Sequence, residues 1–162
     1  MADASSLSGP EPPGGGIASG IIIQVEPSLP GVRLLGVASR AICLQSLSED
    51  EASEMELALV EAATNVVKHG FNEVPEGQLA AEFKIDEASI EVVLRDNGPE
   101  FNPLTAPAST PWAEGNDENF DDLPENGFGL GLIIELTDTQ SYQRDNEQNA
   151  LSLSKTHKPA SN

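Results

Sequence analysis

Hydrophobic and polar positions follow two different periods along this chain. An aliphatic run within residues 17–26 has the length of one strand and ends at a Pro-Ser-Leu-Pro stretch. Apolar positions then recur with the helical period within residues 32–43 and again within residues 55–67. The pattern therefore predicts one strand followed by two amphipathic helices.

Two serines are placed to begin these helices. Ser28 precedes the first helical pattern and is a suitable N-cap residue. Ser48 is followed three residues later by Glu51, which is the spacing of a capping box. We therefore expect the second helix, the clearest element of the chain, to begin just after Ser48.

The second half of the chain alternates short strands with an aperiodic stretch and a glycine-rich helix start. Residues 78–85 and 89–95 read as a hairpin, and residues 139–144 and 150–154 as two more strands. Residues 102–126 have no period, and a loop of that length inside a domain is usually functional or mobile. A Gly-x-Gly-x-Gly segment then leads into an apolar helix that ends near Leu136.

The length of the chain fits one domain with its own core, since it has 162 residues. The Ser-, Pro- and Gly-rich residues 1–16 are expected to be a disordered leader, and residues 156–162 a polar tail. Residues 17–155 would form the domain.

Charge and cysteine content exclude several classes of protein. The 27 acidic and 8 basic side chains give a net charge of −19, which opposes direct binding to nucleic acid or to an anionic membrane. This charge serves solubility or steers the protein toward a basic partner. The single cysteine, Cys43, excludes an internal disulfide. The first residues lack the pattern of a secretory signal, so a cytoplasmic protein is expected.

Glu61 and Asn65 are four residues apart in the second helix and therefore share a face beside its apolar stripe. An amide oxygen next to a carboxylate suits Mg²⁺ on a nucleotide together with a general base. Taken alone, this pair is more often ordinary surface decoration. His69 at the helix end is likewise more often a structural residue than a catalytic one.

Two further segments have the chemistry of a nucleotide site. Asp96-Asn97-Gly98 follows an apolar strand; it is a good turn sequence, and its carboxylate can also accept a hydrogen bond from an adenine amino group. The glycines of 127–131 permit close backbone approach, and the following helix N-terminus offers free N–H groups to phosphate. No Gly-Lys-Ser/Thr follows, so the segment is not a Walker A loop.

The order of these segments resembles the Bergerat-fold (GHKL, histidine-kinase-like) ATPases. The stretches that carry the resemblance are EAATNVVKHGF (61–71), DNGPEF (96–101) and GFGLGL (127–132). The match is stronger still to the RsbW-like anti-sigma-factor serine kinases of bacteria, which GVASR (36–40) in the first helix also resembles. It covers roughly residues 17–155.

The resemblance implies an α+β two-layer sandwich of the Bergerat type, with helices packed on one face of a mixed, mostly antiparallel sheet. Glu61 would accept the proton of a serine hydroxyl, and Asn65 would coordinate the Mg²⁺ that ATP carries. Asp96 would bind the adenine with Gly98 beside it, and residues 102–126 would form the ATP lid. Further nucleotide contacts are implied for Lys68, His69, Phe101, Gly127, Phe128, Gly129, Leu130 and Gly131.

The family also implies a biological role in partner switching. Such a kinase phosphorylates a STAS-type anti-anti-sigma protein on serine, sequesters a sigma factor and is usually a homodimer. The first helix, including Arg40, is the surface we expect to face partners. The alternative is a non-catalytic module, nucleotide-binding or nucleotide-free, that only sequesters a regulatory protein. The ATP domain of a two-component histidine kinase is disfavoured, because neither His69 nor His157 lies in a phospho-accepting helical hairpin.

The chain departs from the family pattern at three places. Asn126 stands where a further glycine often precedes the last Gly-x-Gly, and the predicted lid contains no Lys or Arg. The last strand often opens with Gly-Thr near the adenine, whereas this chain has Asn149-Ala150. The sequence therefore leaves open one hydrogen bond beside the base and keeps the non-catalytic alternative in play.

Overall fold

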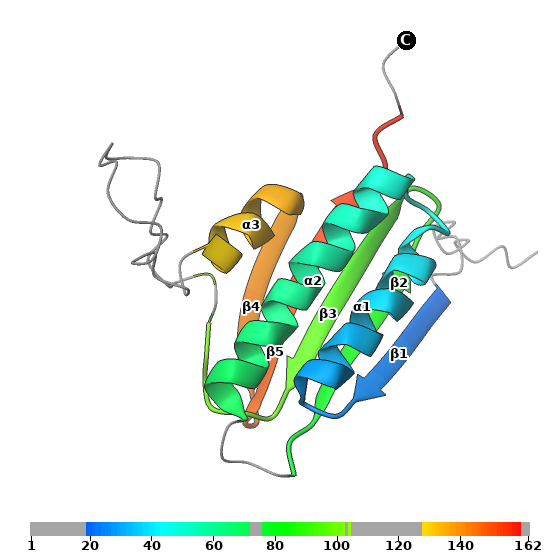
Figure 1. Ribbon diagram of the computed structural model, residues 1–162. Helices are drawn as coiled ribbons and strands as arrows, with labels where there is room; N and C mark the ends of the chain where they lie inside the picture. Colours follow the sequence, from blue (N-terminus) through cyan, green and yellow to red (C-terminus); the bar gives the residue numbers. More distant parts are fainter. Residues whose placement is uncertain (1–18, 72–75, 103, 105–127, 160–162) are drawn as a thin grey trace, which may run out of the picture.

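The computed structural model describes residues 19–71, 76–102, 104 and 128–159. The described elements, in chain order, are β1 (Ser19–Val25), α1 (Leu29–Cys43), α2 (Glu49–Gly70), β2 (Leu79–Ile85), β3 (Ser89–Asp96), α3 (Phe128–Leu136), β4 (Thr139–Asp145) and β5 (Gln148–Thr156). The strands form one sheet, and the helices lie together on one of its faces (Figure 1). The predicted two-layer α+β architecture is thereby confirmed. The predicted lid, residues 102–126, lies outside the described residues apart from Asn102 and Leu104.

The sheet has the strand order β1-β2-β3-β5-β4, and every pairing within the described residues is antiparallel. Successive side chains of a strand point to opposite faces, so alternate residues of β3 share the helix-covered side. Those residues are Ile90, Val92, Leu94 and Asp96, all of them buried. The period-two pattern of β3 thus carries the Asp96 carboxylate to the side on which the helices pack.

Both predicted helix starts are confirmed. The Ser28 side chain accepts a hydrogen bond from the backbone N–H of Gly31 at the start of α1. At the start of α2, Ser48 Oγ accepts from the backbone N–H of Glu51, and the Glu51 carboxylate accepts from the backbone N–H of Ser48 at 2.9 Å. These reciprocal bonds pair N–H groups that a helix start otherwise leaves without a partner.

The apolar stripe of α2 provides the centre of the core. Its buried members pack with residues of α1, α3 and the sheet in one cluster, whose largest fully buried side chains include Leu35, Met55, Leu59, Phe83, Ile133 and Leu153. Val67, the last member of the predicted stripe, is partly buried against this cluster. Because one side of α2 is committed to the core, the side chains next to the stripe are left to face α3 and the end of the sheet.

The segment that follows β5 is fastened to the start of α2. His157 Nδ1 lies 2.7 Å from the Glu51 carboxylate, and the backbone N–H of Lys158 donates to the same carboxylate at 2.8 Å. Burial alone would raise the pKa of Glu51, but the hydrogen bonds from His157, Lys158 and Ser48 outweigh it and lower this pKa to about 2. β5 itself runs to Thr156, two residues beyond the predicted strand end.

None of the helices in the described part of the chain has both the length and the apolar character needed to cross a bilayer.

Candidate functional site

The polar face of α2 presents the first two candidate residues. Glu61 and Asn65 are one turn apart, half-buried, and adjacent to the apolar stripe. Among the residues that the structure describes, neither side chain forms a hydrogen bond or an ion pair. Their oxygen atoms are therefore not committed to any described part of the protein and are available to a ligand.

The first turn of α3 packs directly on this face. A Cβ atom at Gly129 would lie 2.8 Å from Oε2 of Glu61 and 3.4 Å from Nδ2 of Asn65. A Cβ at this position would force the Glu61 carboxylate to shift, whereas its distance from the Asn65 amide would be an ordinary van der Waals contact. The start of α3, the Glu61 carboxylate and the Asn65 amide therefore come together here.

The other predicted residues of the glycine segment are placed differently from one another. Leu130 is buried, and its side chain belongs to the hydrophobic core. Gly131 is exposed, and a Cβ there would meet nothing within 4 Å. Phe128 begins α3, and Gly127 lies outside the described residues. Close backbone approach therefore distinguishes Gly129 from Gly131, although the sequence presents the two glycines alike.

Asp96 is the last residue of β3, one position beyond the predicted strand end, and it is only 5% exposed. Its Oδ1 accepts hydrogen bonds from the backbone N–H of Gly98 and from Nδ2 of Asn149, each at 2.9 Å. Burial raises the pKa of Asp96, while Asn149, the Gly98 N–H and the positive charge of Arg144 oppose that rise. The carboxylate is thus a buried acceptor held in one orientation.

The loop after Asp96 packs against the C-terminal end of α2. A Cβ at Gly98 would lie 3.5 Å from the Cα of Gly70, and a Cβ at Gly70 would lie 3.6 Å from Pro99. The His69 ring stacks on Phe101 with their centroids 5.1 Å apart and their planes at 24°. Lys68 is exposed on the same turn. The structure therefore brings His69 and Phe101 into contact and places Gly98 next to Gly70 at the end of the same helix.

One helix connects the two halves of the site. Gly70 follows Asn65 by five residues, which is about 7.5 Å along a helix axis at 1.5 Å per residue. The carboxylate and amide of α2 therefore lie along the same element whose end contacts the Asp96 loop. The candidate site therefore extends along α2, from the face of Glu61 and Asn65 to the loop that follows Asp96.

Three residues beside Asp96 were missing from the sequence-based site. Asn149 of β5 and Arg144 and Tyr142 of β4 form a hydrogen-bonded group around it. Asn149 was visible only as a departure from the family pattern, and nothing in the local sequence marks Arg144 or Tyr142. Their proximity depends on strand pairing, which the sequence pattern did not specify.

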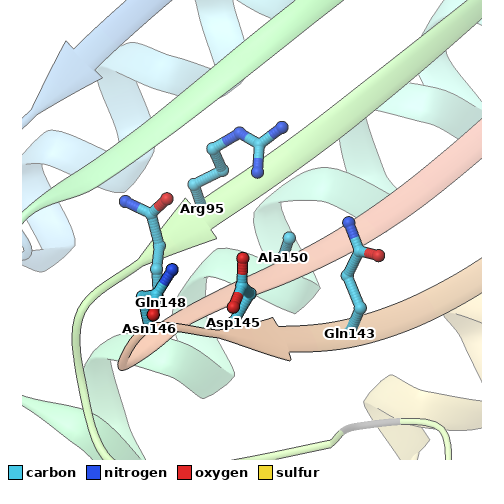
Figure 2. A pocket seen from close by; sticks show the side chains of 6 residues that line it. All are labelled: Arg95, Gln143, Asp145, Asn146, Gln148 and Ala150. Carbon is cyan, nitrogen blue, oxygen red and sulfur yellow. The ribbon is translucent and has the colours of Figure 1, made fainter.

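A shallow depression of about 280 Å³ on the opposite side of the sheet is separate from this site. Figure 2 shows the residues that line it, five polar side chains and one alanine from β3, β4, β5 and the β4–β5 turn: Arg95, Gln143, Asp145, Asn146, Gln148 and Ala150. In β3, Arg95 points away from the helices, because it neighbours the inward-facing Asp96. None of the predicted site residues lines this depression.

Comparison with known proteins shows the family to which the chain belongs. Residues 29–155 match the family model of the histidine kinase-like ATPase domain. The chain is 33% identical over 112 residues to serine-protein kinase RsbW of Bacillus mycoides (strain KBAB4), which covers 69% of this chain and 66%, just under two thirds, of that relative. It is 35% identical over 112 residues to serine-protein kinase RsbW of Listeria innocua serovar 6a, covering 68% of each chain.

A solved structure also shares the fold. The RsbU and RsbW domains of Rv1364c from Mycobacterium tuberculosis superpose with a TM-score of 0.56 over 88% of this chain and 35% of that chain. At 12% identity this likeness concerns the fold alone. The antiparallel sheet with helices on one face is therefore that of a Bergerat fold, as the resemblance implied.

Proposed function

Because this chain belongs to the histidine kinase-like ATPase family, and within it to the RsbW-like group, we propose that it is an ATP-dependent protein-serine kinase. The observation that carries the proposal is the contact between Gly129 and the side chains of Glu61 and Asn65. This contact supports the proposal, because helix starts offer N–H groups to anions and this one lies beside a carboxylate and an amide that form no hydrogen bond with any described residue.

The chemistry of these donors fits Mg²⁺. Magnesium prefers oxygen ligands and usually takes one or two from protein, with phosphates and water supplying the rest. Asn65 would hold the ion through its amide oxygen, with Glu61 one turn away. When bound, the ion would offset negative charge on the phosphates, a task for which the predicted lid offers no Lys or Arg.

Glu61 would act as the general base. As a substrate serine approaches the γ-phosphate, Glu61 takes the hydroxyl proton, the new bond forms between the serine Oγ and phosphorus, and the bond from phosphorus to the ADP oxygen breaks. The products are phosphoserine and ADP. Positioning and charge stabilisation supply most of the catalysis in such transfers, and a base adds to them.

Asp96 would bind the adenine. Its carboxylate is a buried acceptor, and the neighbouring Gly98 has no side chain to obstruct a flat base. His69, in the last turn of α2, and Phe101, in the loop after Asp96, form a stacked pair near this carboxylate's loop. Lys68, Phe128, Gly127, Leu130 and Gly131 remain proposed nucleotide contacts through their positions on the same segments.

The proposed partners are a STAS-type anti-anti-sigma protein as substrate and a sigma factor that the kinase sequesters, with the kinase acting in the cytoplasm as a homodimer. α1 supports a protein-binding role, because its outward side exposes Leu29, Leu34 and Val37 to 57%, 67% and 64%. Arg40 donates to Ser53 Oγ at 2.7 Å and is 41% exposed, so α2 holds it at the border of this surface.

The decisive experiment incubates the protein with labelled ATP and a STAS-type substrate and measures phosphoserine. Glu61→Gln keeps the shape of the side chain and removes the base, so phosphate transfer should fall roughly 10²- to 10⁴-fold while Mg-ATP affinity changes little. Glu49→Gln is the matched control, since that side chain is 84% exposed at the start of the same helix.

Equal phosphate transfer by Glu61→Gln and the wild type would remove Glu61 from the mechanism. Binding of Mg-ATP in calorimetry, with no phosphate on any STAS-type candidate, would favour the non-catalytic partner-switching module. Two features of the sequence favour this alternative. Asn149-Ala150 stands where the family pattern often has Gly-Thr, and the predicted lid is acidic.

A further inference from the structure

Asn149 lies in β5, between β3 and β4, on the face of the sheet that the helices cover. Strand register pairs it directly with Asp96 of β3 on one side and with Arg144 of β4 on the other. Directly paired residues place their side chains next to each other on the same face. Tyr142, two residues before Arg144, lies on that face as well.

The Asn149 side chain is 3% exposed and uses both ends of its amide. Its Nδ2 donates to Asp96 Oδ1 and to the Pro99 carbonyl, each at 2.9 Å. Its Oδ1 accepts from the Tyr142 hydroxyl at 2.7 Å and from Nη1 of Arg144 at 2.6 Å. The same Arg144 nitrogen donates to the Gly98 carbonyl at 3.1 Å.

These partners permit only one orientation of the amide. Arg144 can only donate, so the atom facing it must be the amide oxygen. The Pro99 carbonyl can only accept, so the atom facing it must be the amide nitrogen. The NH₂ group is therefore turned toward Asp96, where it favours the ionised carboxylate.

One oxygen of Asp96 is left for a ligand. Oδ1 already receives two hydrogen bonds, from Asn149 and from the Gly98 N–H. Within the described ranges no hydrogen bond reaches Oδ2. An ionised carboxylate only accepts, so Oδ2 suits a ligand that presents an N–H donor.

We propose that Asn149 is a positioning residue for nucleotide binding: anchored by Tyr142 and Arg144, its amide holds the Asp96 carboxylate and the Gly98–Pro99 carbonyls so that Oδ2 accepts from the exocyclic amino group of a purine. This inference rests on the proposed function, because it presumes a nucleotide at the site. It gives the departure at position 149 a role that the sequence comparison left open.

The electrostatic surroundings of Asp96 make the role measurable by pH. Among the described residues, the titratable groups that interact with Asp96 are Arg144 and Tyr142 of β4. The residues paired with Asp96 in β2 and β5, Leu79 and Asn149, do not titrate, and neither do Gly70 and Phe71, which lie beside the neighbouring Gly98. Asn149 and Arg144 both lower the pKa of Asp96 against burial. Removing the Asn149 donor should therefore shift the loss of ATP binding on acidification to a higher pH.

The test measures Mg-ATP and Mg-GTP affinity of the full chain by calorimetry between pH 5 and 8. Asn149→Asp keeps the side-chain shape but exchanges the donor for a second carboxylate. ATP affinity at neutral pH should fall about 10- to 100-fold, and the preference for ATP over GTP should become smaller. On acidification, ATP binding should be lost at a higher pH than in the wild type. Gln148→Glu adds the same charge one residue away on the exposed opposite face and should change none of these.

Tyr142→Phe is the milder second variant, since it removes only one of the two groups that donate to the amide oxygen of Asn149. It should weaken ATP binding about threefold to tenfold, and it should have no further effect once Asn149 has been changed to Ala. Should Asn149→Asp fail to fold, Tyr142→Phe alone decides: an unchanged ATP affinity in that variant overturns the positioning role.

The possible outcomes separate the two proposals. Wild-type protein that binds neither nucleotide overturns the proposed function and this inference together. Wild-type protein that binds ATP, with folded Asn149→Asp showing the same affinity, nucleotide preference and pH profile, leaves the function standing and overturns the role of Asn149.

Discussion

The two ends of the candidate nucleotide site are built in contrasting ways. At the sheet end, Asp96 is buried and is held by Asn149, which in turn is held by Tyr142 and Arg144. At the helix end, Glu61 and Asn65 form no hydrogen bond with any described residue and meet the backbone of Gly129.

The contrast suggests a division of labour. A preorganised acceptor loses little conformational freedom when a base binds, which favours affinity and selectivity. Polar groups without protein partners can instead reorganise around a metal ion and phosphates during transfer. We therefore expect changes at the sheet end to act mainly on binding, and changes at the helix end to act mainly on the rate.

The largest effect should come from Asp96→Asn, which turns the ligand-facing acceptor into a donor. The new NH₂ group would then face the amino group of the base directly, at roughly 1–3 kcal/mol for each unpaired donor, so ATP affinity should fall a hundredfold or more. Titration calorimetry measures the loss. Asp145→Asn, in the exposed depression of Figure 2, is the matched control and should bind ATP as the wild type does.

The same substitution should not destabilise the fold. Because burial raises the folded-state pKa of Asp96, the contribution of this group to stability is present below its unfolded pKa and is lost as pH rises through the folded value. At neutral pH the ionised carboxylate therefore opposes folding, and Asp96→Asn should unfold at an equal or higher temperature. A clear drop in the thermal midpoint at pH 7 would contradict this account.

A smaller effect, on rate more than on binding, should follow Gly129→Ala. The added Cβ would displace the Glu61 carboxylate, and a misplacement near 1 Å can reduce catalysis about a hundredfold. Gly20→Ala is the control in β1, where a Cβ also meets nothing within 4 Å; it should leave phosphate transfer unchanged. Equal kcat values for the two variants would mean that the close contact at Gly129 has no catalytic consequence.

Lys155→Met should have the smallest effect on phosphate transfer, but it should lower the free energy of unfolding measurably. Lys155 is 7% exposed, donates to the Leu136 carbonyl at 2.7 Å and pairs with Glu54, so it fastens the C-terminal end of α3 to β5 and α2. Loss of these charged contacts should cost about 2 kcal/mol in denaturant unfolding. Lys84→Met removes an exposed pair with Glu91 and should cost less than about 1 kcal/mol. Similar losses in both variants would show that α3 is not held through Lys155.

Local chemistry made much of the architecture predictable. The capping box at Ser48 and Glu51, the stripe from Met55 to Val67 and the alternation in β3 depend on neighbours within a few residues, and the structure confirms each of them. The shared face of Glu61 and Asn65 follows from the helical period alone. What the sequence by itself determined was therefore the elements, their starts and the polarity of their faces.

Only the tertiary structure decided which distant residues meet. Asn149 and Asp96 are 53 residues apart, and their hydrogen bond exists because β5 pairs with β3 in one particular register. Gly129 and Gly131 have the same chemistry in the sequence, yet the packing of α3 on α2 brings only Gly129 close to the Glu61 carboxylate. Register and packing arise from the burial of the whole core, and no short stretch of chain contains that information.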